Sequence, residues 1–164
     1  NDTLDIVVTM NNSLKPFSEF STMDVANICK ILLFSSSHPL AGRKNLTLGN
    51  FSDDVFIAPW EIVDKMIVDT ITSYTRPYGF IPKVRFVKNH ESTVTCVRNN
   101  MGVAIFDEWV WAKNADDLMW IPFKAKDSVS IARMSARESA PVLAMENILR
   151  DVIEEQEKHR NTRL

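Results

Sequence analysis

The sequence has few of the residues that mark common cofactor-binding motifs. Glycine occurs only four times in 164 residues, and neither a G-x-G-x-x-G turn nor a P-loop is present. A phosphate-binding loop needs several glycines because its backbone must approach the ligand closely. The scarcity of glycine argues against a glycine-rich phosphate loop, and we expect no cofactor.

Cysteine and histidine are also scarce. The two cysteines, Cys29 and Cys96, lie in apolar-periodic segments, which predicts buried free thiols, although spacing alone leaves a disulfide open. The three histidines, His38, His90 and His159, are scattered, and no Cys-x-x-Cys or Cys/His ligand spacing occurs. We therefore expect no metal site.

The chain lacks an excess of positive charge and a long apolar run. Its formal net charge is −2 and its pI is about 5.9, with no cluster of Lys and Arg. Phosphate contacts dominate nucleic-acid affinity, so these residues alone are not expected to bind DNA. No apolar run is long enough to span a membrane and no signal peptide is visible, which favours a cytoplasmic fragment without membrane contact.

The sequence also offers no arrangement typical of an enzyme. Ser37 and His38 are neighbours in sequence, but no nucleophile elbow accompanies them. The acidic pairs at 53–54 and 116–117 occur in turn-like segments, which is typical of solvated loop carboxylates. We therefore predict no catalytic residues and no enzymatic activity.

Apolar patterning predicts alternating strands and helices. Short apolar runs predict strands at 4–10, about 26–35, 55–58, 83–87, 102–106, 118–123 and 128–134, and 46–48 is a further short apolar segment. Periodic apolar residues predict helices that start at Pro59, at about Glu91 and at about Ser139. In the last helix, residues 142, 145, 149 and 152, widened by 148 and 153, form the predicted apolar stripe. The fold class is therefore α/β.

Several segments resemble a known family when they are taken in order. His38-Pro-Leu-Ala-Gly-Arg43 follows an apolar strand, and Asp54-Val-Phe-Ile57, Gly79-Phe-Ile-Pro82 and Val97-Arg-Asn-Asn-Met-Gly-Val-Ala-Ile105 follow it. They resemble the second lobe of the effector-binding domain of LysR-type transcriptional regulators. Asn100 stands where the family usually has glycine, and asparagine tolerates left-handed φ.

The resemblance implies a two-lobed fold like that of type 2 periplasmic binding proteins. Residues 26–125 would form a complete second lobe, and 1–25 with 126–164 a partial first lobe. The family's winged helix-turn-helix has no counterpart in this sequence, so DNA would be bound only through that absent N-terminal domain. The implied function is to sense a small-molecule effector between the lobes and to mediate homo-oligomerisation, typically as a dimer.

Ligands of open α/β sheets bind beyond the carboxyl ends of strands, where helix N-termini offer N–H groups to an anion or carboxylate. This rule selects seven candidate ligand-binding residues: Thr9, Met10, Asn11, Pro59, Trp60, Phe106 and Asp107. The segment with Asn89, His90 and Ser92 could also face the site. Each candidate has a structural alternative: Thr9 could satisfy a strand end, Trp60 could pack at a helix start, Phe106 could pack in the core, and Asp107 could cap a turn.

Two other functions stay open at this point. A solute-binding protein of a transporter would have a related fold, and a signal peptide upstream would favour it. A small α/β enzyme would need an acid–base pair that the sequence does not offer. Trp109 and Trp111 fit core packing or a subunit contact better than chemistry.

Overall fold

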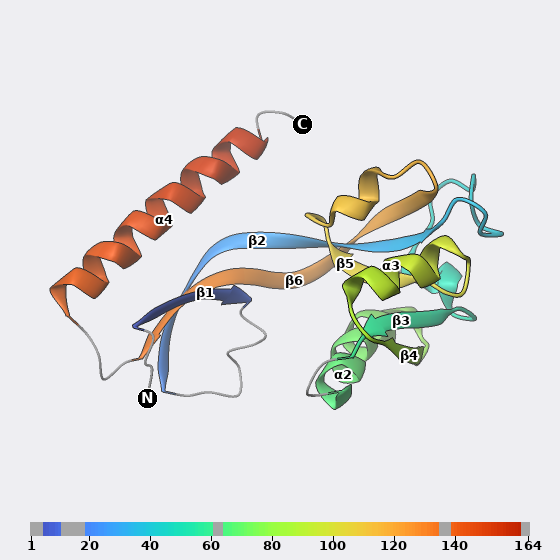
Figure 1. Cartoon of the computed structure of the whole chain (residues 1–164), viewed down its shortest axis with the longest axis horizontal. Coiled ribbons are helices and arrows are strands. Elements are labelled where there is room, and N and C mark those ends of the chain that lie inside the picture. Colours follow the sequence, from blue (N-terminus) through green and yellow to red (C-terminus); the bar gives the residue numbers. More distant parts are fainter. Residues whose placement is uncertain (1–4, 11–18, 61–63, 135–138, 162–164) are drawn as a thin grey trace. The chain divides into compact units, whose positions relative to one another are not determined.

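The computed structural model describes residues 5–10, 19–60, 64–134 and 139–161. The fold is mixed α/β, as predicted (Figure 1). Its elements are, in order, β1 (Ile6–Met10), β2 (Phe20–Ser35), a 3-10 turn (Leu48–Phe51), β3 (Val55–Pro59), α2 (Asp64–Thr75), a 3-10 turn (Arg76–Tyr78), β4 (Lys83–Val87), α3 (His90–Arg98), β5 (Ala104–Asp107), a 3-10 turn (Trp111–Asn114), β6 (Leu118–Met134) and α4 (Ala140–Asn161).

The chain forms two compact units. The second unit is the continuous stretch Cys29–Ala125, and the first unit combines Asn1–Ile28 with Lys126–Leu164. Strands β2 and β6 are long enough to contribute to both units. The strand orders are β1-β6-β2-β5 in one sheet and β3-β4 in the other.

The second unit is built around the apolar end of β2. Ile31 and Leu33 pack with Val94 and Val97 of α3, whereas Leu32 and Phe34 pack in a separate cluster with Phe51 and Phe56. All four β2 residues are buried, as expected of a strand covered on both faces. This explains why the segment is a continuous apolar run and does not alternate.

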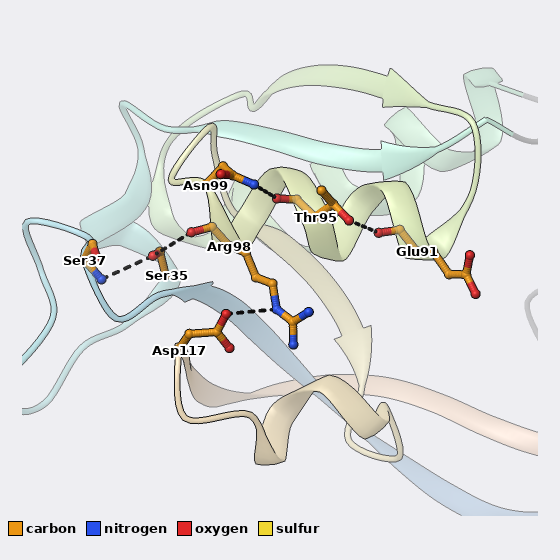
Figure 2. Close-up of polar contacts among 7 residues, drawn as sticks. All are labelled: Ser35, Ser37, Glu91, Thr95, Arg98, Asn99 and Asp117. Atoms are coloured by element: carbon orange, nitrogen blue, oxygen red, sulfur yellow. Dashed lines mark hydrogen bonds and ion pairs between the residues drawn. The ribbon is translucent and has the colours of Figure 1, made fainter.

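Helix α3 is held at its carboxyl end by β2 and by Asp117, the residue before β6. Figure 2 shows Ser35 donating a hydrogen bond to the carbonyl of Arg98, at 3.2 Å, and Arg98 Nε lying 3.0 Å from a carboxylate oxygen of Asp117. The Asn99 side chain adds a bond to the carbonyl of Thr95. These contacts fix the helix relative to the strands, and therefore also fix the position of its first turn.

The turn from α3 into β5 needs unusual backbone angles. Asn100 has φ of 53°, as the sequence predicts for the residue in the family's glycine position, and Gly102 has φ of 154°. A Cβ on Gly102 would lie 2.2 Å from the carbonyl oxygen of Val55. That oxygen accepts a hydrogen bond from the N–H of Val103, and the N–H of Ile57 bonds to Val103 in turn. The glycine therefore lets β3 join the segment that leads into β5.

The first unit has a smaller core. Strand β1 pairs antiparallel with β6, in a register that places Ile6 opposite Arg133 and Met10 opposite Val129. Met10, Val129 and Ile153 of α4 pack with buried residues of β2. Arg133 and Glu146 form an ion pair of 3.1 Å between β6 and α4. This pair connects the helix to the strands by a contact that is almost shielded from water.

Several predicted boundaries were wrong. Pro59 is the last residue of β3 and does not begin a helix; the next described helix starts at Asp64. The predicted strands 118–123 and 128–134 are one continuous strand, β6. Strand β2 begins at Phe20, well before the predicted start. In each case, pairing with a neighbouring strand made a strand longer than its local sequence pattern predicts.

The burial predicted for the cysteines was wrong: Cys29 is exposed and Cys96 is half-buried, and both are free thiols. On α4 Val142 is buried, whereas Met145, Ile148 and Val152 of the predicted apolar stripe are about half exposed, at 50%, 57% and 50%. Among the described residues, no helix is long and apolar enough to span a membrane.

Candidate functional site

A surface pocket of about 300 Å3 lies in the second unit, between the first turn of α3 and the carboxyl end of β5. Its lining residues are His90, Glu91, Val94, Phe106, Asp107, Trp109 and Val110. Two of them, Phe106 and Asp107, are predicted ligand-binding residues, and His90 belongs to the segment that was predicted to face the site. A volume of this size suits a small organic molecule.

The first turn of α3 is set by its own capping residue. The Asn89 side chain accepts a hydrogen bond from the backbone N–H of Ser92, at 2.8 Å, and so begins the helix. Val94, one turn later, is buried against β2 and β5, and anchors this end of the helix. His90 and Glu91 are exposed and reach the pocket, so the helix start supplies one polar wall.

The end of β5 supplies the opposite wall. Phe106 is buried at 8% exposure, and its ring centroid lies 5.9 Å from that of His90. Asp107 is paired in register with Lys30 of β2, and Lys30 Nζ lies 2.6 Å from Asp107 Oδ1. The side chain of Lys30 is 12% exposed, and that of Asp107 is 35% exposed. The lysine therefore holds the carboxylate in a fixed position at the pocket.

The other predicted residues of the second unit lie at the end of a different strand. Pro59 pairs with Val87 in the parallel β3-β4 sheet. Trp60 directly follows; it is 64% exposed, and its ring lies edge-on to Phe86 at 6.1 Å. Neither residue lines the pocket. Trp60 is therefore a surface aromatic side chain that packs on β4, and ligand binding by Pro59 and Trp60 stays a prediction.

The predicted residues of the first unit lie on β1. Thr9 is half-buried and paired in register with Ser130. Met10 is paired with Val129 and packs on the core of its unit. Asn11 lies outside the described residues. Ligand binding by Thr9 and Met10 stays a prediction.

The sequence matches no protein-family model and no curated protein. Solved structures do match. The OxyR C206 mutant of Corynebacterium glutamicum is 16% identical with a TM-score of 0.74, over 93% of this chain and 49% of that one. The effector binding domain of QuiR in complex with shikimate is 15% identical with a TM-score of 0.69, over 94% of this chain and 72% of that one. HinK, a LysR family transcriptional regulator from Pseudomonas aeruginosa, is 14% identical with a TM-score of 0.69, over 93% of this chain and 52% of that one.

The chain has the LysR effector-domain fold. This is the predicted α/β fold of the type 2 periplasmic-binding-protein kind. The chain spans about half the length of the full regulators that it matches. At this level of identity the likeness describes the fold, and the chemistry of the site must be argued from this chain's own residues.

Within the LysR effector-domain fold, three pocket features escaped the sequence analysis. Trp109 was interpreted as a core or subunit contact, but it is 54% exposed and lines the pocket. Glu91 was treated only as part of a helix start. Lys30 was not considered, although a lone lysine in an otherwise apolar strand was a usable signal, because a buried cation needs a partner.

The lining of the pocket is mostly apolar. Its walls combine aromatic and aliphatic side chains with two carboxylates and one imidazole. Within the described ranges, no group of three or more His, Cys, Asp or Glu side chains could hold a metal ion. What the arrangement offers is a concave, largely apolar surface with a few fixed polar groups, which is the usual makeup of a small-molecule site.

Proposed function

We propose that the chain is the ligand-sensing regulatory domain of a LysR-type DNA-binding transcription factor. It binds a small-molecule effector at the pocket between α3 and β5 and does not act as an enzyme. The observation that carries the proposal is the coincidence of this pocket with a fold whose solved examples include an effector binding domain in complex with shikimate. The place of the pocket, beyond a strand's carboxyl end and at a helix start, supports it further.

The proposal also assigns the two units. The second unit corresponds to the complete second lobe, predicted at 26–125, and the first unit to the partial first lobe. The pocket residues Phe106 and Asp107 form the effector site of the second lobe, together with Pro59 and Trp60 at the neighbouring strand end. Ligand contact by Thr9, Met10 and Asn11, which belong to the first unit, stays a separate proposal. A regulator of this kind works in the cytoplasm, where its DNA target lies, and it contacts DNA through a separate domain.

A thermal-shift screen tests the sensing function. The chain would be heated with panels of carboxylates, amino acids, amines, aromatic acids and sugar phosphates. At least one compound should raise the melting temperature saturably, because a ligand that binds only the folded state stabilises it by about 2.7 kcal/mol at one hundred times its Kd. The rise should be lost in Trp109→Ala, which removes an exposed wall of the pocket, and kept in Trp120→Ala, the same change at an exposed tryptophan that does not line it. A well-folded chain that responds to no compound would contradict the proposal.

We further propose that the domain associates with a second copy through α4. Met145, Ile148 and Val152 are spaced three and four residues apart, so they lie on one side of the helix. This side continues the buried face that carries Val142. Exposed apolar stripes of this kind are typical of protein–protein contacts.

A charge introduced on this stripe tests the association. Ile148→Glu should shift the chain toward the monomer in sedimentation velocity, by at least about tenfold in dissociation constant, because a buried unpaired carboxylate opposes the contact. Asn147→Glu is the matched control, since it adds the same charge beside Arg150 on the other side of the helix. Equal behaviour of the two variants, or a monomeric parent chain, would contradict the proposed contact.

A further inference from the structure

The lining of the pocket identifies the chemical class of its ligand. Resting on the proposed function, we infer that the effector carries a positively charged amine next to an apolar, preferably aromatic, group. This differs from the anion or carboxylate that helix N-termini alone would predict. The charges, the capping of α3 and the aromatic wall support it independently of one another.

The fixed charges around the pocket sum to a negative value. Glu91 and Asp107 line it with one carboxylate each, and Lys30 neutralises one of the two. Lys30 bonds to Oδ1 of Asp107 at 2.6 Å, and it is not among the lining residues. Of the two lining carboxylates, one therefore keeps a negative charge that Lys30 does not neutralise, and this charge attracts a cation and repels a carboxylate.

The start of α3 is a poor anion site in this chain. The Asn89 side chain already accepts from the N–H of Ser92, one of the groups that an anion would use. Glu91 in the first turn places a negative charge at the positive end of the helix dipole. An anionic ligand would meet this carboxylate at the very position where the dipole would otherwise favour it.

Aromatic side chains complete the match to a cationic group. Phe106 and Trp109 line the pocket, and Trp109 is about half exposed and therefore accessible. A cation over an aromatic face is stabilised by the ring quadrupole, most strongly over tryptophan. Val94 and Val110 supply aliphatic surface for the apolar part of the ligand. An arylalkylamine uses all of these groups together.

A pair of probes that differ mainly in charge tests the inference. The chain would be titrated at pH 7 with 2-phenylethylamine and with 3-phenylpropionate, and binding would be followed in 15N–1H spectra by the indole N–H peaks of the four tryptophans. Trp109→Phe identifies the Trp109 peak by its loss. The amine should move this peak saturably, whereas the carboxylate should leave it in place.

Two substitutions with opposite expected effects sharpen the test. Glu91→Gln removes a lining charge and should weaken amine binding about fivefold, the upper range for an exposed ion pair. Lys30→Met removes the competing cation and keeps the aliphatic stem, so it should strengthen amine binding about twofold. Asp69→Asn on α2 is the control, because it removes an exposed carboxylate that does not line the pocket. Melting temperatures would verify that each variant is folded.

The outcomes separate this inference from the proposed function. A Trp109 response to phenylpropionate and not to phenylethylamine would overturn the amine class and leave effector sensing intact. No response to phenylethylamine, or an affinity that Glu91→Gln leaves unchanged, would overturn it too. If the wider thermal-shift panel also yields no ligand, both the amine inference and the proposed sensing function are contradicted.

Discussion

Gly102→Ala is expected to lower the free energy of unfolding by about 3 to 5 kcal/mol. The added Cβ would lie 2.2 Å from the carbonyl oxygen of Val55 and 3.1 Å from side-chain atoms of Ile57. The backbone must also keep φ at 154°, which a residue with a side chain rarely adopts. Relief of the clash would move β3 away from Val103 and break the two backbone hydrogen bonds between them.

Urea unfolding followed by far-ultraviolet circular dichroism measures this loss. Gly42→Ala is the matched control, because Gly42 has φ of 82° but no atom within 4 Å of an added Cβ. It should lose only the conformational part, about 1 to 2 kcal/mol. If Gly102→Ala costs no more than Gly42→Ala, the close approach of β3 does not contribute to stability as described.

Glu146→Gln should be the next most damaging change, at about 2 to 3 kcal/mol. Its side chain is 16% exposed and that of Arg133 is 13% exposed, so water screens the pair only weakly. Removing one partner of a buried pair costs about 3 to 5 kcal/mol, and the residual exposure lowers that figure. The loss should be concentrated in α4, which the pair connects to β6, and hydrogen exchange should show faster exchange along that helix.

A double substitution and a surface pair provide the controls. Arg133→Met combined with Glu146→Leu should recover much of the stability, because apolar side chains of similar size can replace a buried ion pair. Asp151→Asn removes a partner of Arg150 at 3.9 Å, with a carboxylate that is 77% exposed, and should change stability by less than about 0.5 kcal/mol. An equal loss for Asp151→Asn and Glu146→Gln would mean that burial does not set the strength of these pairs.

Local patterns in the sequence predicted the elements whose form depends on neighbours in the chain. The strand at 83–87, the helix that begins near Glu91 and the left-handed Asn100 were all found. Long-range pairing was harder to predict. Strand β6 continues through Lys124 and Asp127, which lie between its two predicted parts, and Pro59 pairs with Val87 at a strand end where its missing N–H is tolerated.

The residues of the candidate site also differ in whether neighbours in the sequence are enough to predict them. Phe106 and Asp107 could be predicted because they follow a strand that ends next to a helix start. The role of Lys30 could not, since its pairing with Asp107 depends on the register between β2 and β5, two strands far apart in the sequence. Trp109 follows β5 by two residues, but neither periodicity nor composition distinguishes a tryptophan in a pocket from one in a core.

The division of the chain into one continuous and one interrupted unit has a consequence for how it folds. All of Cys29–Ala125 belongs to the second unit, whereas the first unit needs both Asn1–Ile28 and Lys126–Leu164. Joining two such distant ends in an unfolded chain carries a loop-closure entropy that grows with the logarithm of loop length. Once residues 29–125 have folded, most of this loop-closure entropy has already been lost. The pairing of β1 with β6 then costs less entropy than it would in an unfolded chain. The continuous, pocket-bearing unit can thus fold first, and the first unit, which needs both of its segments, can form after it.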